Sequence, residues 1–167
     1  MIELNFAIDS LDKSQCSFYL INELCKHKNK ISPLIFVSNI TILPFAPPCP
    51  VLHAAEAWGQ EGIMITTTPA TTFKCFKFPR LTRRIFYLWD LYYLRGGRRV
   101  YEPYLDLFSR ENLEIVVRSE SHKRAVENCF NVQVKGIVDN FNMDDMLNVL
   151  NIVDDGSPNK QVLVHGI

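Results

Sequence analysis

The sequence predicts a single α/β domain in which a mostly parallel sheet is covered by helices on both faces. Its length of 167 residues suits one domain. Hydrophobic residues make up 47% of the chain and charged residues 22%, which is the balance of a globular protein. Several short apolar runs are nearly continuous instead of alternating with polar residues, and this pattern is typical of strands buried on both faces.

The first elements follow from apolar runs and from the residues that end them. Residues 3–8 predict a strand, closed by Asp9-Ser10, which can cap a helix. Apolar residues at helical spacing predict that helix over residues 11–28. A second strand is predicted over residues 34–37. Four prolines in residues 44–50 exclude regular structure there and indicate a rigid surface loop.

The remaining elements alternate between strand and helix. Further strands are predicted over residues 51–55, 63–67, 84–88, 113–117 and 134–138, and helices over residues 101–108, 121–130 and 144–150. This alternation predicts a Rossmann-like, doubly wound sheet. Gly96-Gly97-Arg98-Arg99 is interpreted as a flexible basic turn. Residues 1–141 are expected to form the domain, with residues 142–167 adding a helix, a short strand over residues 161–164 and a tail packed on it.

Composition narrows the functional classes. With 18 basic and 18 acidic residues the formal net charge is zero, which argues against a broad nucleic-acid surface and leaves a local basic patch open. No apolar stretch approaches the roughly 18 residues of a membrane span, and the N-terminus is interpreted as a strand, not a signal peptide. The five cysteines include no closely spaced pair, so we expect buried or half-buried free thiols in a reducing cytoplasm. Four scattered histidines predict no metal site.

Aromatic residues concentrate in residues 73–104. One interpretation is that they pack the core and the helices. The other is that they form a stacking platform for a sugar or a partner protein. The sequence leaves both open.

The strongest candidate site follows the strand predicted over residues 113–117. Ligands of parallel α/β sheets bind beyond the carboxyl ends of the strands, and here a turn leads directly into a helix that Ser119 or Ser121 can cap. Arg118, Ser121, His122 and Lys123 lie near that helix start, where a phosphate or a sugar hydroxyl could bind. Capping combined with a solvated charged surface is the alternative.

Further candidates lie at the ends of other predicted strands. His53 could orient or deprotonate an acceptor hydroxyl, or it could be structural. Asp90 could bind a sugar, act as a base, or cap a helix near Leu91. Asp139 and Asn140 could bind a ligand or form a turn. We expect His53, Asp90, Arg118, Ser119 and Asp139 to meet in one cleft. The sequence contains no GxSxG, GxGxxG or GxxxxGK[ST] motif.

Three stretches resemble a known enzyme family. Residues 116–141, VVRSESHKRAVENCFNVQVKGIVDNF, resemble the end of the N-terminal domain in retaining, glycogen-synthase-like GT-B glycosyltransferases, with Ser119-Glu120 following the strand. Residues 136–141, GIVDNF, stand where the family has an Asn-Gly-containing turn. Residues 51–58 are similar to the family's strand with a His-rich turn. Residues 86–91 resemble a strand of glycosyltransferase-like proteins of large tailed phages.

The resemblance implies one half of a two-domain enzyme. A sugar or glycan acceptor is then expected at Arg118, Ser119, Glu120, Ser121, His122, Asp139 and Asn140. A nucleotide-sugar donor would be held by a second domain or subunit, with no tightly bound cofactor in this one. A viral protein of this kind would work in the host cytoplasm. Two other readings stay open: a non-catalytic protein-interaction module that keeps the fold, and a flavodoxin-like domain that binds a nucleotide or another small molecule.

Overall fold

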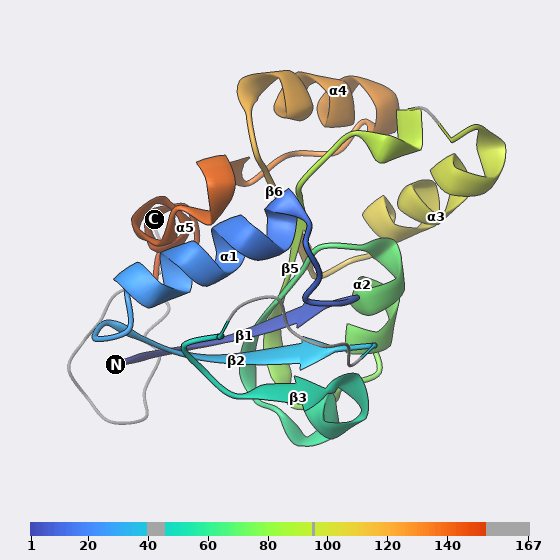
Figure 1. Ribbon diagram of the computed structural model, residues 1–167. Helices are drawn as coiled ribbons and strands as arrows, with labels where there is room; N and C mark the ends of the chain where they lie inside the picture. The colour runs from blue at the N-terminus through green and yellow to red at the C-terminus, as the bar shows by residue number, and fades with distance from the viewer. Residues whose placement is uncertain (40–45, 95, 153–167) are drawn as a thin grey trace.

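The computed structural model describes residues 1–39, 46–94 and 96–152, and it contains one seven-stranded, all-parallel sheet with helices on both faces (Figure 1). The strands are β1 (Ile2–Ile8), β2 (Ile31–Val37), β3 (Val51–His53), β4 (Gly62–Thr66), β5 (Leu81–Leu88), β6 (Leu113–Val117) and β7 (Gly136–Ile137). Their spatial order is β3-β2-β1-β4-β5-β6-β7. The chain therefore winds outward in both directions from β1 and β4, and the predicted Rossmann-like fold is confirmed.

Helices follow all of the strands except β2 within the described residues. The α-helices are α1 (Gln15–Lys26), α2 (Pro69–Cys75), α3 (Arg98–Phe108), α4 (Glu120–Phe130) and α5 (Met143–Val149), and the 3-10 helices are η1 (Ala54–Gly59), η2 (Tyr92–Leu94) and η3 (Asp139–Phe141). Within the described ranges no helix has both the length and the apolarity that crossing a bilayer requires.

The first helix begins four residues later than predicted. Ser14, not Asp9 or Ser10, caps α1, and its Oγ accepts a hydrogen bond from the Ser17 N–H at 3.2 Å. The Asp12 carboxylate accepts from the Ser14 N–H at 2.9 Å and orders the intervening loop. Apolar spacing predicted the helix, but the local hydrogen bonds of Asp12 and Ser14 decide where it starts.

Other boundaries also differ from the predictions. The strand predicted over residues 51–55 ends at His53 because η1 begins there, and the one over residues 134–138 shrinks to β7. The basic turn predicted over residues 96–99 is shorter than expected. Arg98 and Arg99 already belong to α3, so only Gly96 and Gly97 remain in the turn. Helix α2 was not predicted, because a seven-residue, threonine-rich segment shows little helical periodicity. The predicted strand over residues 161–164 and part of the proline-rich loop lie outside the described residues.

The two faces of the sheet bury separate sets of side chains. Alternate residues of β1 point in opposite directions, so Leu4 and Phe6 pack under α1 whereas Ala7 packs on the side of α2. On the first face Met143 and Met146 of α5 join the same cluster, so α5 packs on this domain. The second face is covered by α2, α3, α4 and η1.

The aromatic segment mainly serves these cores. Phe78, Phe86, Tyr87, Tyr93 and Tyr104 are buried, as the core interpretation expects. Tyr92 is exposed and Trp89 is half-buried, and both lie where β5 ends. This end of the segment is therefore accessible to a ligand.

A half-buried ion pair joins β5 to β6 at the end of the sheet opposite the candidate site. Arg83 donates to both oxygens of Glu114, at 2.6 and 2.7 Å, and to the carbonyl of Leu150 at 2.8 Å. Lys135 Nζ lies 3.2 Å from the same carboxylate. Burial alone would raise the pKa of Glu114, but the hydrogen bonds and charges of Arg83 and Lys135 outweigh it and lower that pKa below 4.5.

We therefore expect Glu114→Gln to lower the free energy of unfolding at neutral pH by about 2 kcal/mol. Because the folded-state pKa of Glu114 is depressed, its contribution is present above the ordinary value and is lost as the pH falls through the folded value. The stability of the wild type should thus fall more steeply than that of the variant below about pH 4.5. Urea unfolding between pH 3 and 7 measures this, and parallel pH profiles would contradict it.

Candidate functional site

Polar side chains follow three adjacent strands where each ends. Asp90 lies two residues beyond β5, Arg118 directly follows β6, and Asp139 lies two residues beyond β7. All strands are parallel, so these residues share the carboxyl edge of the sheet, the usual ligand edge of such folds. We call Trp89, Asp90, Arg118, Ser119, His122 and Asp139 the edge cluster.

Arg118 is the centre of the edge cluster. Its guanidinium carbon lies 4.2 Å from the centroid of the Trp89 ring, and its Nε lies 3.8 Å from Asp139 Oδ1. Its side chain is 28% exposed, yet within the described residues its guanidinium has no hydrogen-bond partner. A guanidinium carries five N–H donors in a planar fork. Arg118 thus holds several donors unused at the edge of the sheet.

Trp89 is held in place by aromatic neighbours. Its ring stacks on Phe141 with centroids 5.5 Å apart and an interplanar angle of 19°. Tyr19 of α1 lies 5.8 Å from it. These contacts fix the surface on which Arg118 rests. Tyr19 was not predicted as a site residue. Trp89 belongs to residues 73–104, for which a stacking platform was one interpretation, and it directly precedes Asp90 at the end of a strand.

The turn after β7 is fixed by a buried hydroxyl. Tyr87 donates to the Val138 carbonyl at 2.7 Å and accepts from the Phe141 N–H at 3.3 Å. Asn140 and Phe141 both adopt positive φ angles, 46° and 60°, which are costly for residues other than glycine. The hydroxyl and the packed Phe141 ring offset this cost, and they hold Asp139 beside Arg118.

Ser119 is the N-cap of α4 and organises its first turn. Its Oγ lies 2.6 Å from His122 Nδ1 and 2.8 Å from Ser121 Oγ, and it accepts from the His122 N–H at 3.3 Å. Burial lowers the pKa of His122, the Arg118 charge lowers it further, and Asp90 opposes both. These effects together favour the neutral form of His122, and Ser119 fixes the orientation of its ring.

Two substitutions should move the pKa of His122 in opposite directions. Arg118→Gln removes a positive charge, so we expect the pKa to rise. Asp90→Asn removes a negative charge, so we expect it to fall. The His122 ring protons, followed by NMR from pH 4 to 8, report both shifts. A pKa of His122 that is unchanged in both variants would mean that neither charge faces the ring.

Asp90 and the start of α1 complete the surroundings. Asp90 Oδ1 accepts from the Tyr92 N–H at 2.9 Å, so this residue caps η2, as the capping interpretation expected. Burial, followed by the charges of Asp90 and Asp12, raises the pKa of Cys16 in α1 to about 12, against the effect of Arg118. The Cys16 thiol is therefore protonated and borders the edge cluster.

His53 lies apart from the edge cluster. It ends β3, four strands away from β5, which at about 4.8 Å per strand amounts to about 19 Å. Its Nδ1 accepts from the Ala55 N–H at 3.2 Å, and its own N–H donates to Glu56 at 3.3 Å. These two hydrogen bonds cap η1 reciprocally. His53 therefore has the structural role that the sequence left open as the alternative to catalysis. The five residues expected in one cleft all lie at the carboxyl edge of the sheet. Asp90, Arg118, Ser119 and Asp139 lie on neighbouring strands there, but His53 lies apart from them.

The other candidate residues have surface or turn roles. Glu120 pairs with Arg124 at 3.4 Å on the exposed side of α4. Ser121 is exposed and bonds only Ser119 among the described residues. Asn140 donates to Asp139 Oδ2 at 3.1 Å, while its own side-chain oxygen is buried without a partner. Glu120 therefore adds little to the edge cluster, whereas Asn140 positions Asp139.

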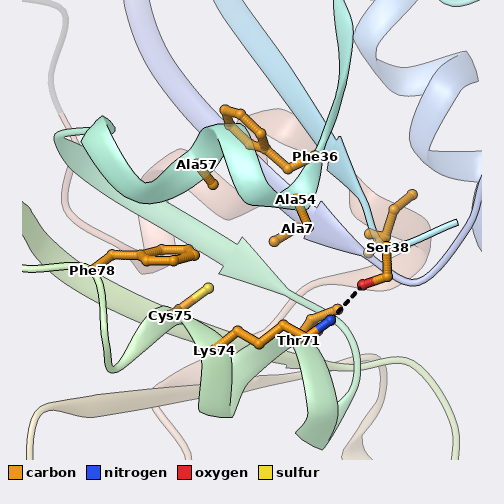
Figure 2. Close-up of a pocket in the computed structure, with 10 residues that line it drawn as sticks. Ala7, Phe36, Ser38, Ala54, Ala57, Thr71, Lys74, Cys75 and Phe78 are labelled. Carbon is orange, nitrogen blue, oxygen red and sulfur yellow. Dashed lines mark hydrogen bonds between the residues drawn. The ribbon is translucent and has the colours of Figure 1, made fainter. Parts of the chain in front are cut away.

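A separate hollow lies on the α2 face, beneath η1 (Figure 2). Alanine, phenylalanine and cysteine side chains line most of it, and Lys74 closes its polar side by donating to Ser38 Oγ at 3.0 Å. A water molecule's centre can occupy about 10 Å³ of it, which is room for about one water. The hollow is too small for a substrate in this conformation, and no motif in the sequence predicts it.

Within the described residues no group of three or more histidine, cysteine, aspartate or glutamate side chains could hold a metal ion. Comparison with protein-family models, with curated proteins and with solved structures finds no match to this chain.

Proposed function

We propose that this domain is the acceptor-side half of a GT-B-type glycosyltransferase and that the edge cluster binds a neutral, polyhydroxylated ligand. The observation that carries the proposal is the Arg118 guanidinium, half-buried on the Trp89 ring and without a hydrogen bond to any described residue. The resemblance of residues 116–141 to such enzymes favours the same function.

The charges of the edge cluster favour a neutral ligand over an anion. Arg118 lies between two carboxylates, Asp90 on one neighbouring strand and Asp139 on the other. A phosphate near Arg118 would meet both of these negative charges. A sugar hydroxyl can instead accept from the guanidinium and donate to a carboxylate at the same time. Tyr19, half-buried and 5.8 Å from Trp89, offers aromatic surface to the apolar C–H face of a sugar ring.

An edge of this kind is suited to holding an acceptor more than to catalysing transfer alone. Asp139 is 71% exposed and Asp90 is also exposed, so the site faces water. Glycosyl transfer requires the donor to be aligned with the acceptor hydroxyl, and such positioning can lower a barrier by about 7–11 kcal/mol. A second domain or subunit would supply the nucleotide-sugar donor and exclude water from the cleft. Asp90 is our candidate for the group that accepts the acceptor's proton.

Two measurements test this proposal. Titration with maltotriose, followed by NMR of the Trp89 indole, should show saturable shifts at millimolar concentration, whereas inorganic phosphate should leave the indole unchanged. The purified chain, given UDP-glucose or ADP-glucose with maltotriose, should release no UDP or ADP above background. Shifts caused by phosphate and not by the saccharide would overturn the neutral-ligand proposal. Robust turnover by this chain alone would overturn the acceptor-half proposal.

A second candidate function is a non-catalytic protein-interaction module. Phe18 and Tyr92 are both more than half exposed, and they lie on the two elements that border the edge cluster. Exposed aromatic side chains are common in protein interfaces. If the saccharide titration is silent and no nucleotide-sugar binds at millimolar concentration, this function is favoured.

A further inference from the structure

Cation–π contacts gather positive charge on helix α2, which lies beside α3 on one face of the sheet (Figure 1). The guanidinium carbon of Arg110, just after α3, lies 5.6 Å from the centroid of the Phe73 ring and 5.9 Å from that of Phe76. The guanidinium carbon of Arg84, on β5, lies 5.6 Å from the same Phe76 ring. Lys77 directly follows Phe76 and is exposed. We call Phe73, Phe76, Lys77, Arg84 and Arg110 the basic patch.

The segment that supplies most of the basic patch carries positive charge only, although the whole protein is neutral. Residues 62–89 contain five basic residues and no acidic one. Arg80 and Arg83 are each paired with a glutamate from elsewhere in the fold. Lys77 and Arg84 have no carboxylate partner among the described residues. The fold therefore leaves part of this charge without compensation.

Both guanidinium groups keep donors for a ligand. The half-buried Arg84 donates to the Cys75 carbonyl at 3.1 Å and to the Phe78 carbonyl at 2.9 Å, and its Nη1 donates to no described residue. Arg110 is 47% exposed, and its Nη2 lies 3.3 Å from both carboxylate oxygens of Asp106. Exposed pairs at this spacing contribute little to stability, so an incoming anion can replace Asp106.

We propose that the basic patch binds single-stranded nucleic acid. A guanidinium matches two oxygens of one phosphate with two parallel N–H donors, and the Lys77 ammonium adds a further positive charge for the strand. The open face of a guanidinium can in addition stack on a base. The exposed Arg110 is placed for this stacking, and Arg84 is placed for a phosphate. The basic patch is local, which agrees with a neutral chain that has no broad nucleic-acid surface.

The basic patch is separate from the site of the proposed glycosyl transfer. Arg110 lies three residues before β6, whereas Arg118 directly follows that strand. The two sites therefore lie toward opposite ends of the same strand, and they share no residue. Nucleic-acid binding and saccharide binding can for this reason be lost independently of each other.

Other anionic partners fit the basic patch less well. Phe73 and Phe76 are half-buried, and none of the exposed large apolar residues of the described chain belongs to the patch, so it offers no side chain that would enter a bilayer. An acidic peptide would pair with the same cations, but its carboxylates bring no ring to stack on Arg110. The combination of guanidinium groups with aromatic rings therefore favours a nucleic acid.

The test is to titrate a fluorescent oligothymidylate of about twelve nucleotides with the full chain and to follow its anisotropy. We expect saturable binding with a dissociation constant of about 1–100 µM at low salt, the range of sequence-independent binding. Each phosphate neutralised on a single strand contributes about −0.7 to the slope of log K against log salt concentration. Three cations therefore predict a slope of about −2.

Arg110→Gln and Arg98→Gln form a matched pair. Each removes one positive charge, and each arginine pairs with an acidic residue four positions away, Asp106 or Glu102. Of the two, Arg110 is the one that rests on aromatic rings within the described chain. We expect Arg110→Gln to weaken binding about 5–10-fold and to reduce the steepness of the salt slope by about 0.7. Arg98→Gln should stay within about twofold of the wild type.

Asp106→Asn should act in the opposite direction. It frees the Arg110 guanidinium from its carboxylate partner, so we expect binding to tighten about 2–3-fold. A variant that had merely lost its fold would not bind more tightly than the wild type, and thermal unfolding of each variant checks this directly. Unchanged or weaker binding by a folded Asp106→Asn would count against Arg110 as a contact of the ligand.

Three further outcomes would overturn the proposal. The first is the absence of saturable binding at low salt. The second is equal weakening by Arg110→Gln and Arg98→Gln, which would mean that only net charge acts. The third is displacement of the oligonucleotide by polyglutamate as effectively as by unlabelled oligothymidylate, which would make an acidic protein the partner. Titration of Arg110→Gln with maltotriose should still shift the Trp89 indole signal as in the wild type, and this keeps a failure here distinct from a failure of the proposed saccharide site.

Discussion

Replacing Tyr87 with phenylalanine should lower the free energy of unfolding by about 2–4 kcal/mol, although only one oxygen is lost. That oxygen donates to the Val138 carbonyl and accepts from the Phe141 N–H. The ring is fully buried, so no water can easily take its place. Both backbone groups would lose this partner in the interior, and an unsatisfied buried group costs more than a hydrogen bond contributes.

The local backbone makes the effect larger. Asn140 and Phe141 hold positive φ angles that only the surrounding contacts stabilise. Without the Tyr87 hydroxyl, the turn can relax and move Asp139 away from Arg118. We therefore expect the Trp89 indole signal, which reports the edge cluster, to shift as well.

Thermal unfolding with Tyr101→Phe as the control measures this effect. The Tyr101 hydroxyl also donates to a backbone carbonyl, that of Cys129 at 3.2 Å, but at an exposed position. Its loss should cost less than about 1 kcal/mol, because water replaces it. The melting temperature of Tyr87→Phe should fall by about 10 °C and that of the control by about 3 °C or less. Equal decreases in melting temperature would show that the buried Tyr87 hydroxyl stabilises the fold no more than the exposed Tyr101 hydroxyl does.

The parallel sheet could be predicted because strands that are buried on both faces can be recognised from their own apolar residues. The runs that became β5 and β6 end in consecutive apolar residues, 85–88 and 115–117, a pattern that surface strands do not show. The strand over residues 113–117 and the Ser119 cap follow from adjacent residues alone, and both are confirmed. Helix α2 could not be found in this way, because its start is decided by reciprocal hydrogen bonds between Thr68 and Thr71.

The candidate site was predictable only in part. Strand ends place Asp90, Arg118, Ser119 and Asp139 on one edge by the parallel rule. The order of the strands, which put β3 at the far edge and His53 away from the others, is a property of the whole fold and is not encoded near His53. The contact of Trp89 with Arg118 likewise depends on the register of β5 against β6.

Replacing Arg118 with glutamine should weaken binding of maltotriose to the edge cluster by about 10–100-fold, since hydrogen bonds from a charged donor contribute about 1.5–3 kcal/mol each. Glutamine keeps a polar end but loses the charge, the fork of donors and the stacking on Trp89. Arg118→Lys keeps the charge alone, so it should recover only part of the affinity.

Arg98→Gln is the control for charge. Arg98 is exposed, pairs with Glu102 four residues along α3 and lies outside the edge cluster, so its loss should leave maltotriose binding within about twofold of the wild type. NMR titration of each variant gives the dissociation constants, and thermal unfolding shows whether the fold is retained. If both substitutions weaken binding equally, the effect is one of net charge and not of the Arg118 site. If neither does, the unused donors of Arg118 do not face the saccharide, and the neutral-ligand proposal loses the observation on which it rests.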